Sequence, residues 1–255
     1  MKIQVTSYLI RKIVTVAIQL GVGLILMLPA STFGQSQYQK SKILSIIDST
    51  QKIYGINDLL VDGQVYYQAN RMATGTPFLF SSSFANGKIY TRGIQFNVEG
   101  INYDVASDNL ILLNTTQQGK RLHIQLSNSL VDSFELLDYL FVAPTQLKID
   151  TKYNYLLAVN SGKYRLFLGY KKEFINRYSQ RNPYGKFSST KRVMFISTKD
   201  TLLRVNSKRT FIKTIPSSKK EISSYIKKHR IKLLQATPNQ LKQLMEFYNK
   251  LMYNQ

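Results

Sequence analysis

The sequence predicts a mainly β protein, with an antiparallel sandwich or barrel-like core of about ten to twelve strands followed by two C-terminal amphipathic helices. Short runs of alternating apolar and polar residues recur between positions 58 and 215, and turn pairs such as Asn-Gly separate them. The chain has 17 Tyr and 13 Phe, which suit strands, and from residue 216 the apolar spacing becomes helical.

Residues 1–34 are predicted to be a signal peptide. They carry three cations and no acid, and residues 13–28 are apolar at all but two positions. Small residues follow, compatible with cleavage after Ala30 or Gly34. An uncleaved anchor is the alternative, because the apolar stretch is near the lower limit for crossing a bilayer. Either way we expect export, to the periplasm or the outer-membrane periphery.

After a polar lead-in over residues 35–57, Asp62-Gly63 predicts a first hairpin. Residues 88–114 then predict a three-stranded meander. Tyr90, Phe96 and Val98 share one parity, Glu99-Gly100 interrupts the run, and residues 107–109 form a second break. The apolar face of this meander requires a covering layer.

Residues 163–178 predict a long two-faced strand or strand pair, with Gly169 as a bulge. Turns are expected at residues 160–162 and 182–185. The other predicted strands are residues 121–126, 130–136, 139–142, 153–159, 193–196, 202–205 and 210–215.

The two helices each begin with a capping signal. Ser218 with Glu221 forms one capping box, and Thr237, Pro238 and Gln240 begin the second helix. We expect residues 216–255 to form a helical cap on a β domain of residues 58–215. Short strands and a helical ending argue against an integral outer-membrane β-barrel.

Positive charge is concentrated in the C-terminal part of the chain. The net charge is +21, yet residues 35–150 hold nine Lys/Arg against ten Asp/Glu, whereas residues 151–255 hold 23 against four. This asymmetry favours an anionic partner, with a merely solvated surface as the alternative. The candidate anion-binding residues are Lys163, Arg165, Lys171, Lys172, Arg177, Arg181, Lys191 and Arg192. A second basic patch, Lys219, Lys220, Lys227, Lys228 and Arg230, is predicted to be the wet face of a helix.

Several chemistries find little support in the residues present. The absence of Cys excludes disulfides, thiol nucleophiles and Cys-ligated zinc. The two histidines, His123 and His229, lie far apart in the sequence, and no metal or cofactor site is predicted. Glu99, Asp104 and Asp108 could form an acidic pair for hydrolysis or calcium binding, but Asp residues that bracket a turn usually bind their own backbone.

The order of several short motifs resembles a family of uncharacterised exported proteins of Bacteroidota. The motifs are Gly-x-Pro-Phe-Leu at residues 75–79, Gly-Ile-Gln-Phe at 93–96, Asn-Tyr-Asp at 102–104, Asp-Asn-Leu-Ile-Leu at 108–112, Val-Asp-Ser-Phe-Glu-Leu at 131–136, residues 153–167 and residues 225–232. The resemblance covers about residues 58–251. It implies an envelope location and an unassigned function, and it transfers no catalytic residue.

The sequence therefore predicts an exported, non-enzymatic envelope protein that acts as a binding or accessory subunit. Its expected partner is another envelope protein or an anionic envelope surface. The alternative is a polyanion-binding module for an anionic glycan or lipid head group, and a hydrolase ranks lower. Aromatic and basic residues alternate over residues 163–187, a pattern that suits single-stranded nucleic acid, but export makes that partner unexpected.

Overall fold

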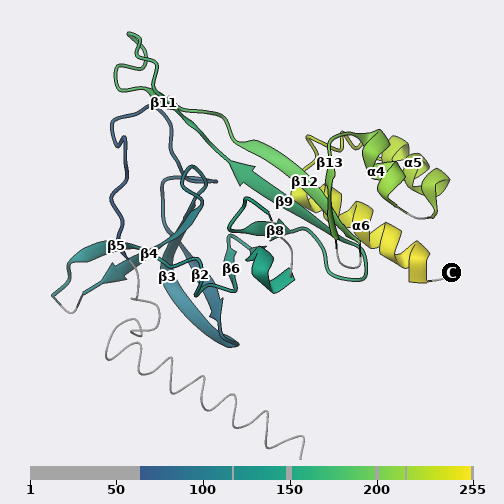
Figure 1. Cartoon of the computed structure of the whole chain (residues 1–255), viewed down its shortest axis with the longest axis horizontal. Helices are drawn as coiled ribbons and strands as arrows, with labels where there is room; N and C mark the ends of the chain where they lie inside the picture. Colours follow the sequence, from purple (N-terminus) through teal and green to yellow (C-terminus); the bar gives the residue numbers. More distant parts are fainter. Residues whose placement is uncertain (1–63, 117, 148–150, 199–200, 216, 254–255) are drawn as a thin grey trace, which may run out of the picture. The chain divides into compact units, whose positions relative to one another are not determined.

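A computed structural model describes residues 64–116, 118–147, 151–198, 201–215 and 217–253 (Figure 1). All of them belong to one unit, Thr50–Gln255. The predicted signal peptide, the lead-in at residues 35–57 and the first strand and turn of the hairpin at Asp62-Gly63 lie outside the described residues.

The described chain is mainly β, as predicted. Eleven strands form one antiparallel sheet in the order β1-β5-β4-β3-β2-β6-β7-β8-β9-β12-β13, which is open, with β1 and β13 at its ends (Figure 1). Strands β10 and β11 form a separate pair. The strand bounds are β1 Gln64–Val65, β2 Ala85–Thr91, β3 Ile94–Asp104, β4 Asn109–Thr115, β5 Arg121–Gln125, β6 Ser133–Leu136, β7 Tyr139–Val142, β8 Leu156–Ala158, β9 Arg165–Lys171, β10 Phe174–Ile175, β11 Lys186–Phe187, β12 Lys191–Thr198 and β13 Thr201–Val205.

The predicted meander is present as β2, β3 and β4, but its first turn was misplaced. Arg92 and Gly93 both have positive φ, 49° and 76°, and they close a two-residue hairpin between β2 and β3. Strand β3 continues through Glu99-Gly100, but with an irregularity there, because Gly87 pairs with Val98 whereas Ala85 pairs with Ile101. The pair of residues that looked like a turn is therefore a bulge within β3, and the alternation of burial stops there, since residues 100–104 are all buried.

Four rings hold the centre of the sheet's buried face. Phe134 stacks on Phe141 at 4.7 Å between ring centroids, and Tyr103 and Tyr155 meet Phe134 edge-on at 5.6 and 5.0 Å. All four side chains are almost completely buried. They come from β3, β6, β7 and the residue before β8, so this contact joins distant strands of the sheet.

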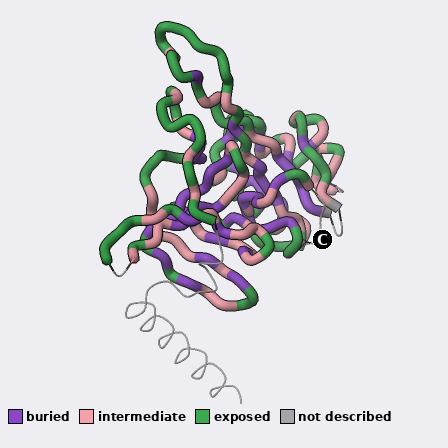
Figure 2. The backbone as a smooth tube through the Cα atoms, turned by 60° about the vertical axis from the view of Figure 1, so that its left-hand side comes forward, coloured by how far each residue is buried: buried purple, intermediate pink, exposed green. Residues whose placement is uncertain are grey.

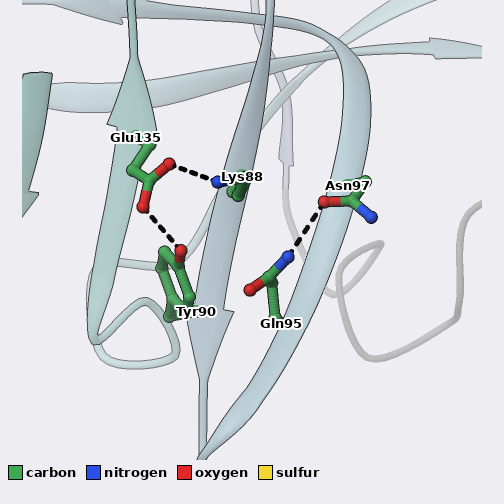
Figure 3. A network of polar contacts seen from close by, with 5 residues as sticks. All are labelled: Lys88, Tyr90, Gln95, Asn97 and Glu135. Atoms are coloured by element: carbon green, nitrogen blue, oxygen red, sulfur yellow. Dashed lines mark hydrogen bonds and ion pairs between the residues drawn. The ribbon is translucent and has the colours of Figure 1, made fainter. Parts of the chain in front are cut away.

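The opposite face of the same strands is polar (Figure 3). Glu135 on β6 accepts hydrogen bonds from Lys88 Nζ at 2.7 Å and from Tyr90 Oη at 2.6 Å, both on β2. On β3, Gln95 donates to Asn97 at 3.1 Å. Where β2, the start of β3 and β6 pair, the sheet therefore has the period-two pattern of one wet face. In β4 and β9, by contrast, three and four consecutive residues are buried.

Strands β9 and β12 pair without a register shift, so the predicted bulge at Gly169 is absent. The ring of Tyr153 explains the glycine instead, because a Cβ at Gly169 would lie 3.1 Å from three of its ring atoms.

The chain ends in three helices, α4 Lys208–Thr214, α5 Lys219–Lys228 and α6 Pro238–Tyr253, after a short 3₁₀ turn, η1 Pro144–Leu147, earlier in the chain. The strand predicted at residues 210–215 is wrong: Ser207 accepts from the backbone N–H of Thr210 at 3.0 Å and caps helix α4. Six residues are too few for apolar spacing to separate helix from strand.

The two predicted helices are present, with different caps. Ser218 has positive φ and its side chain does not cap α5, so that capping box is not formed. The second box is confirmed: Gln240 N–H donates to Thr237 Oγ1 at 3.3 Å, and Thr237 N–H donates to Gln240 Oε1 at 3.0 Å. Helix α6 packs against the start of β9, where Asn249 Oδ1 accepts from the Tyr164 N–H at 3.1 Å.

Candidate anion-binding surface

The eight candidate cations all belong to one long hairpin, residues 163–192, built from β9, β10, β11 and the start of β12. Lys163 and Arg165 lie at one end of β9 and Lys171 at the other, roughly 20 Å away at the rise of a strand. The eight residues therefore do not form a single patch.

Lys172 is a structural residue. Its side chain is buried, and Nζ donates to the backbone carbonyls of Thr76, at 3.0 Å, and Phe78. Burial lowers its pKa, and the nearby Asp104 carboxylate opposes that shift. Lys172 ties the end of β9 to the segment before β2, which leaves its ammonium group turned away from an external anion.

Lys191 and Arg192 also have partners within the fold. Lys191 pairs with Glu173 at 2.7 Å, an exposed ion pair of small energetic weight. Arg192 donates through Nη1 to the carbonyl of Ala236 at 2.6 Å and through Nη2 to that of Leu234. The guanidinium thereby holds the segment that leads into α6.

Lys163 and Arg165 remain at the surface beside aromatic rings. The Lys163 Nζ lies 5.7 Å from the centroid of the Tyr164 ring, and the Arg165 guanidinium carbon lies 5.6 Å from that of Phe167. Lys163 is the one near α6, because Tyr164 also contacts Tyr248 of that helix at 5.0 Å between ring centroids.

The other end of the hairpin projects from the sheet, and we call it the arm: residues 67–76 and 174–187 (Figure 1). Strands β10 and β11 form its base, and Asn182 accepts from the N–H of Gly185 to close the predicted turn. Residues 67–76 lie beside this loop and are hydrogen-bonded to it. Thr74 N–H donates to Gly185 O at 3.0 Å, and Phe187 N–H donates to Thr74 O at 2.9 Å.

The arm is basic and contains no acid. Arg177 and Arg181 are exposed in its loop and have no ion-pair partner among the described residues. Sequence reasoning found these two but missed Arg71 and Lys186, which the bridge between Thr74 and Lys186 brings to the same structure. That bridge joins segments about a hundred residues apart, and no local pattern predicts it.

The arm also exposes apolar side chains. Figure 2 shows its loop as mostly exposed. Tyr178 is 64% exposed and Tyr184 55%, and neither ring stacks on another or hydrogen-bonds within the described residues. The other large exposed apolar side chains of the arm are Tyr67, Met72 and Ile175.

The three candidate acids do not converge on a shared pocket. Glu99 is exposed on β3, roughly 17 Å along the strand from Asp104. Asp104 accepts from the N–H groups of Ala106 and Ser107 at 2.9 and 3.0 Å, as an Asp at a turn does.

Asp108, on the far side of that turn, accepts from the Tyr103 hydroxyl and from the Asn154 N–H at 2.8 Å. Burial raises its pKa, and these hydrogen bonds oppose the shift. The interpretation as turn chemistry is thus confirmed for Asp104, whereas Asp108 lies at the same turn, with φ of 62°, but its carboxylate binds Tyr103 and Asn154 rather than the backbone of the turn.

The histidines pack against rings rather than against each other. His123 stacks on Phe84 at 4.8 Å and His229 lies 4.1 Å from Tyr225, both measured between ring centroids. Within the described ranges, no three His, Asp or Glu side chains gather closely enough to hold a metal ion.

Four cations of the second basic patch lie on α5 as predicted, and Arg230 follows just after its C-terminal end. Ile222 and Ile226 are the buried side of this helix, and the five cations of the patch, Lys219, Lys220, Lys227, Lys228 and Arg230, are exposed.

Comparison with known proteins found no matching family model, no matching curated protein and no matching solved structure. The resemblance to exported proteins of Bacteroidota therefore stays a prediction. Among the described helices, none is both long and apolar enough to cross a membrane.

Proposed function

We propose that this chain is an exported, non-enzymatic binding protein of the cell envelope whose cationic C-terminal half holds an anionic partner. The observation that supports it most is the imbalance between cations and available carboxylates. Within the described residues there are two ion pairs, Lys88–Glu135 and Lys191–Glu173. The other exposed cations that the structure describes after residue 150 have no carboxylate partner among the described residues, and this leaves a positive field to attract anions.

Two of the three acids that could have served hydrolysis have structural roles instead. Asp104 and Asp108 already use their oxygens to build the β3–β4 turn and to hold Tyr66, Tyr103 and Asn154. A carboxylate engaged in this way stabilises the sheet.

Titration with dextran sulfate over a series of salt concentrations tests anion binding directly. We expect binding at low ionic strength that weakens as salt is added, because screening shortens the reach of exposed charges. Two variants compare how much each basic region contributes to this binding. One replaces four lysines of the α5 patch with Gln (Lys219, Lys220, Lys227 and Lys228), and the other carries Arg177→Gln and Arg181→Gln in the arm. No binding of the unmodified chain at low salt would end the proposal of an anionic partner.

Export is tested by fractionating cells that express the full sequence and sequencing the N-terminus of the accumulated product. We expect a product in the envelope fraction that begins after Ala30 or Gly34. A chain that stays in the cytosol with Met1 intact would refute this location and would make nucleic acid the first partner to reconsider.

An accessory role in an assembly is the second candidate, since the arm presents unpartnered side chains. Purification of the tagged chain from the envelope fraction would support it if one protein co-purifies in a fixed ratio and is lost when the arm residues are changed.

A further inference from the structure

The arm combines two properties on one projecting element: unpaired positive charge and exposed aromatic rings. Its four cations have no acid among them, and its tyrosines have no contact that explains their exposure. Exposing aromatic surface to water is unfavourable at about 25 cal/mol per Å². A partner that covers the rings would recover that energy.

Packing contacts at the base of the arm fix its conformation, so the exposure of its side chains is a property of the folded structure. Phe174 and Phe187 contact each other across β10 and β11 with ring centroids 5.6 Å apart. A side chain at Gly185 would clash, because its Cβ would lie 2.7 Å from Phe174 Cζ and 2.9 Å from the carbonyl oxygen of Ile175. The tip beyond this point, residues 176–184, is carried away from the sheet (Figure 1).

The shape of the tip favours a surface over a small ligand. Sites for small molecules are concave, whereas this element projects, as the exposed loop in Figure 2 shows. A soluble polyanion without aromatic bases, such as dextran sulfate, would use only the cations and would leave Tyr178 and Tyr184 in water. A bilayer interface accepts both, because tyrosine rings settle at the level of the head groups and cations bind anionic lipids there.

We infer that the tip of the arm docks on a bilayer that contains anionic lipid, with Tyr178 and Tyr184 entering the head-group region and Arg177 and Arg181 binding lipid phosphates. This inference rests on the proposed cationic binding role and names the partner of one part of that surface. The contact is interfacial, because the loop of residues 176–184 is far too short to span a membrane.

The absence of Trp from the chain provides a site-specific test. Tyr178→Trp places a single fluorescent reporter at the tip. Tyr253→Trp places the control at a tyrosine that is 94% exposed at the end of α6. Each full-length variant is mixed with vesicles of phosphatidylglycerol and phosphatidylcholine in equal parts, and with vesicles of phosphatidylcholine alone. Because emission reports the surroundings of one residue, attachment through another part of the chain does not produce the signal.

We expect a blue shift, and quenching by brominated lipid, for Tyr178→Trp with the anionic vesicles only. Adding Arg177→Gln and Arg181→Gln should raise the lipid concentration for half-maximal shift about 25-fold at low salt, about fivefold for each charge. Adding Tyr184→Ser should raise it by roughly threefold to tenfold while dextran sulfate binding is unchanged.

An unshifted Tyr178→Trp signal with both vesicle types overturns the inference. If dextran sulfate still binds, the cations serve a soluble anion and the proposed function survives; if it does not, both fail. An equal shift with neutral vesicles, or a shift at Tyr253→Trp alone, also overturns it. A partner protein that protects Tyr178→Trp from an aqueous quencher without vesicles would assign the arm to protein docking instead.

Discussion

Gly87 is a point where one methyl group should disturb the centre of the sheet. It lies in β2, between β3 and β6, at a register shift between Ala85 and Gly87. A Cβ there would lie 2.4 Å from Ile101 Cδ1 and 2.5 Å from the carbonyl oxygen of Glu135. The isoleucine can rotate, but the carbonyl belongs to the backbone of β6, so Gly87→Ala must push two paired strands apart by about 1 Å.

We expect Gly87→Ala to lower the free energy of unfolding by about 3 kcal/mol, the upper part of the range for overpacked sites. That is a large share of the roughly 5–15 kcal/mol that stabilises a typical domain, yet it leaves the variant folded and measurable. Urea unfolding followed by far-ultraviolet circular dichroism gives the midpoint and the slope.

Gly93→Ala is the matched control. It lies in the β2–β3 turn with φ of 76° and no atom within 4 Å of its Cβ position, so the change costs only backbone strain, about 1 kcal/mol. If the two variants unfold within about 0.5 kcal/mol of each other, the close approach of β2 to β6 is not as described.

Three further outcomes test other parts of the fold. Phe134→Ala should cost about 3–5 kcal/mol because it empties a fully buried aromatic cluster, whereas Phe80→Ala, 40% exposed, should cost far less, both measured by urea unfolding. Arg192→Lys should cost about 1–2 kcal/mol because one ammonium group cannot replace two guanidinium bonds to carbonyls, while Arg177→Lys should be neutral in the same assay. The hydrogen bonds from Lys88 and Tyr90 lower the pKa of the Glu135 carboxyl from its ordinary value of 4.5. The ionised carboxylate therefore stabilises the fold above pH 4.5, and this contribution is lost as the pH falls through the lower pKa of the folded state. Glu135→Gln should therefore be less stable than the unmodified chain by at most about 1 kcal/mol at pH 7, and the difference should vanish in acid.

Local sequence patterns were informative wherever neighbours along the chain decide the structure. Alternation identified Phe96 and Val98 as inward positions of the meander but wrongly placed Tyr90 on their face, because the turn at Arg92-Gly93 puts Tyr90 on the polar side. The Thr237–Gln240 box identified the start of α6. The same reasoning failed at residues 210–215, where an apolar run of six fits either a strand or a helix. It also placed a turn at Glu99-Gly100, where β3 instead has a bulge against β2 and continues.

The candidate site shows where such reasoning ends. Lys171 and Lys172 are adjacent and chemically identical, yet the first is exposed and the second is buried. The carbonyls that bind Lys172 lie 96 and 94 positions away in the chain.

Composition and spacing alone determined that this is a basic, thiol-free chain with strands first and helices last, because each of those properties is held by single residues or near neighbours. Only the tertiary structure decided which cations are held inside the fold and which remain available on the arm. Whether a cation can bind an external anion depends on which carbonyls and carboxylates lie next to it in the folded protein. The sheet supplies those neighbours from segments that are far apart in the sequence.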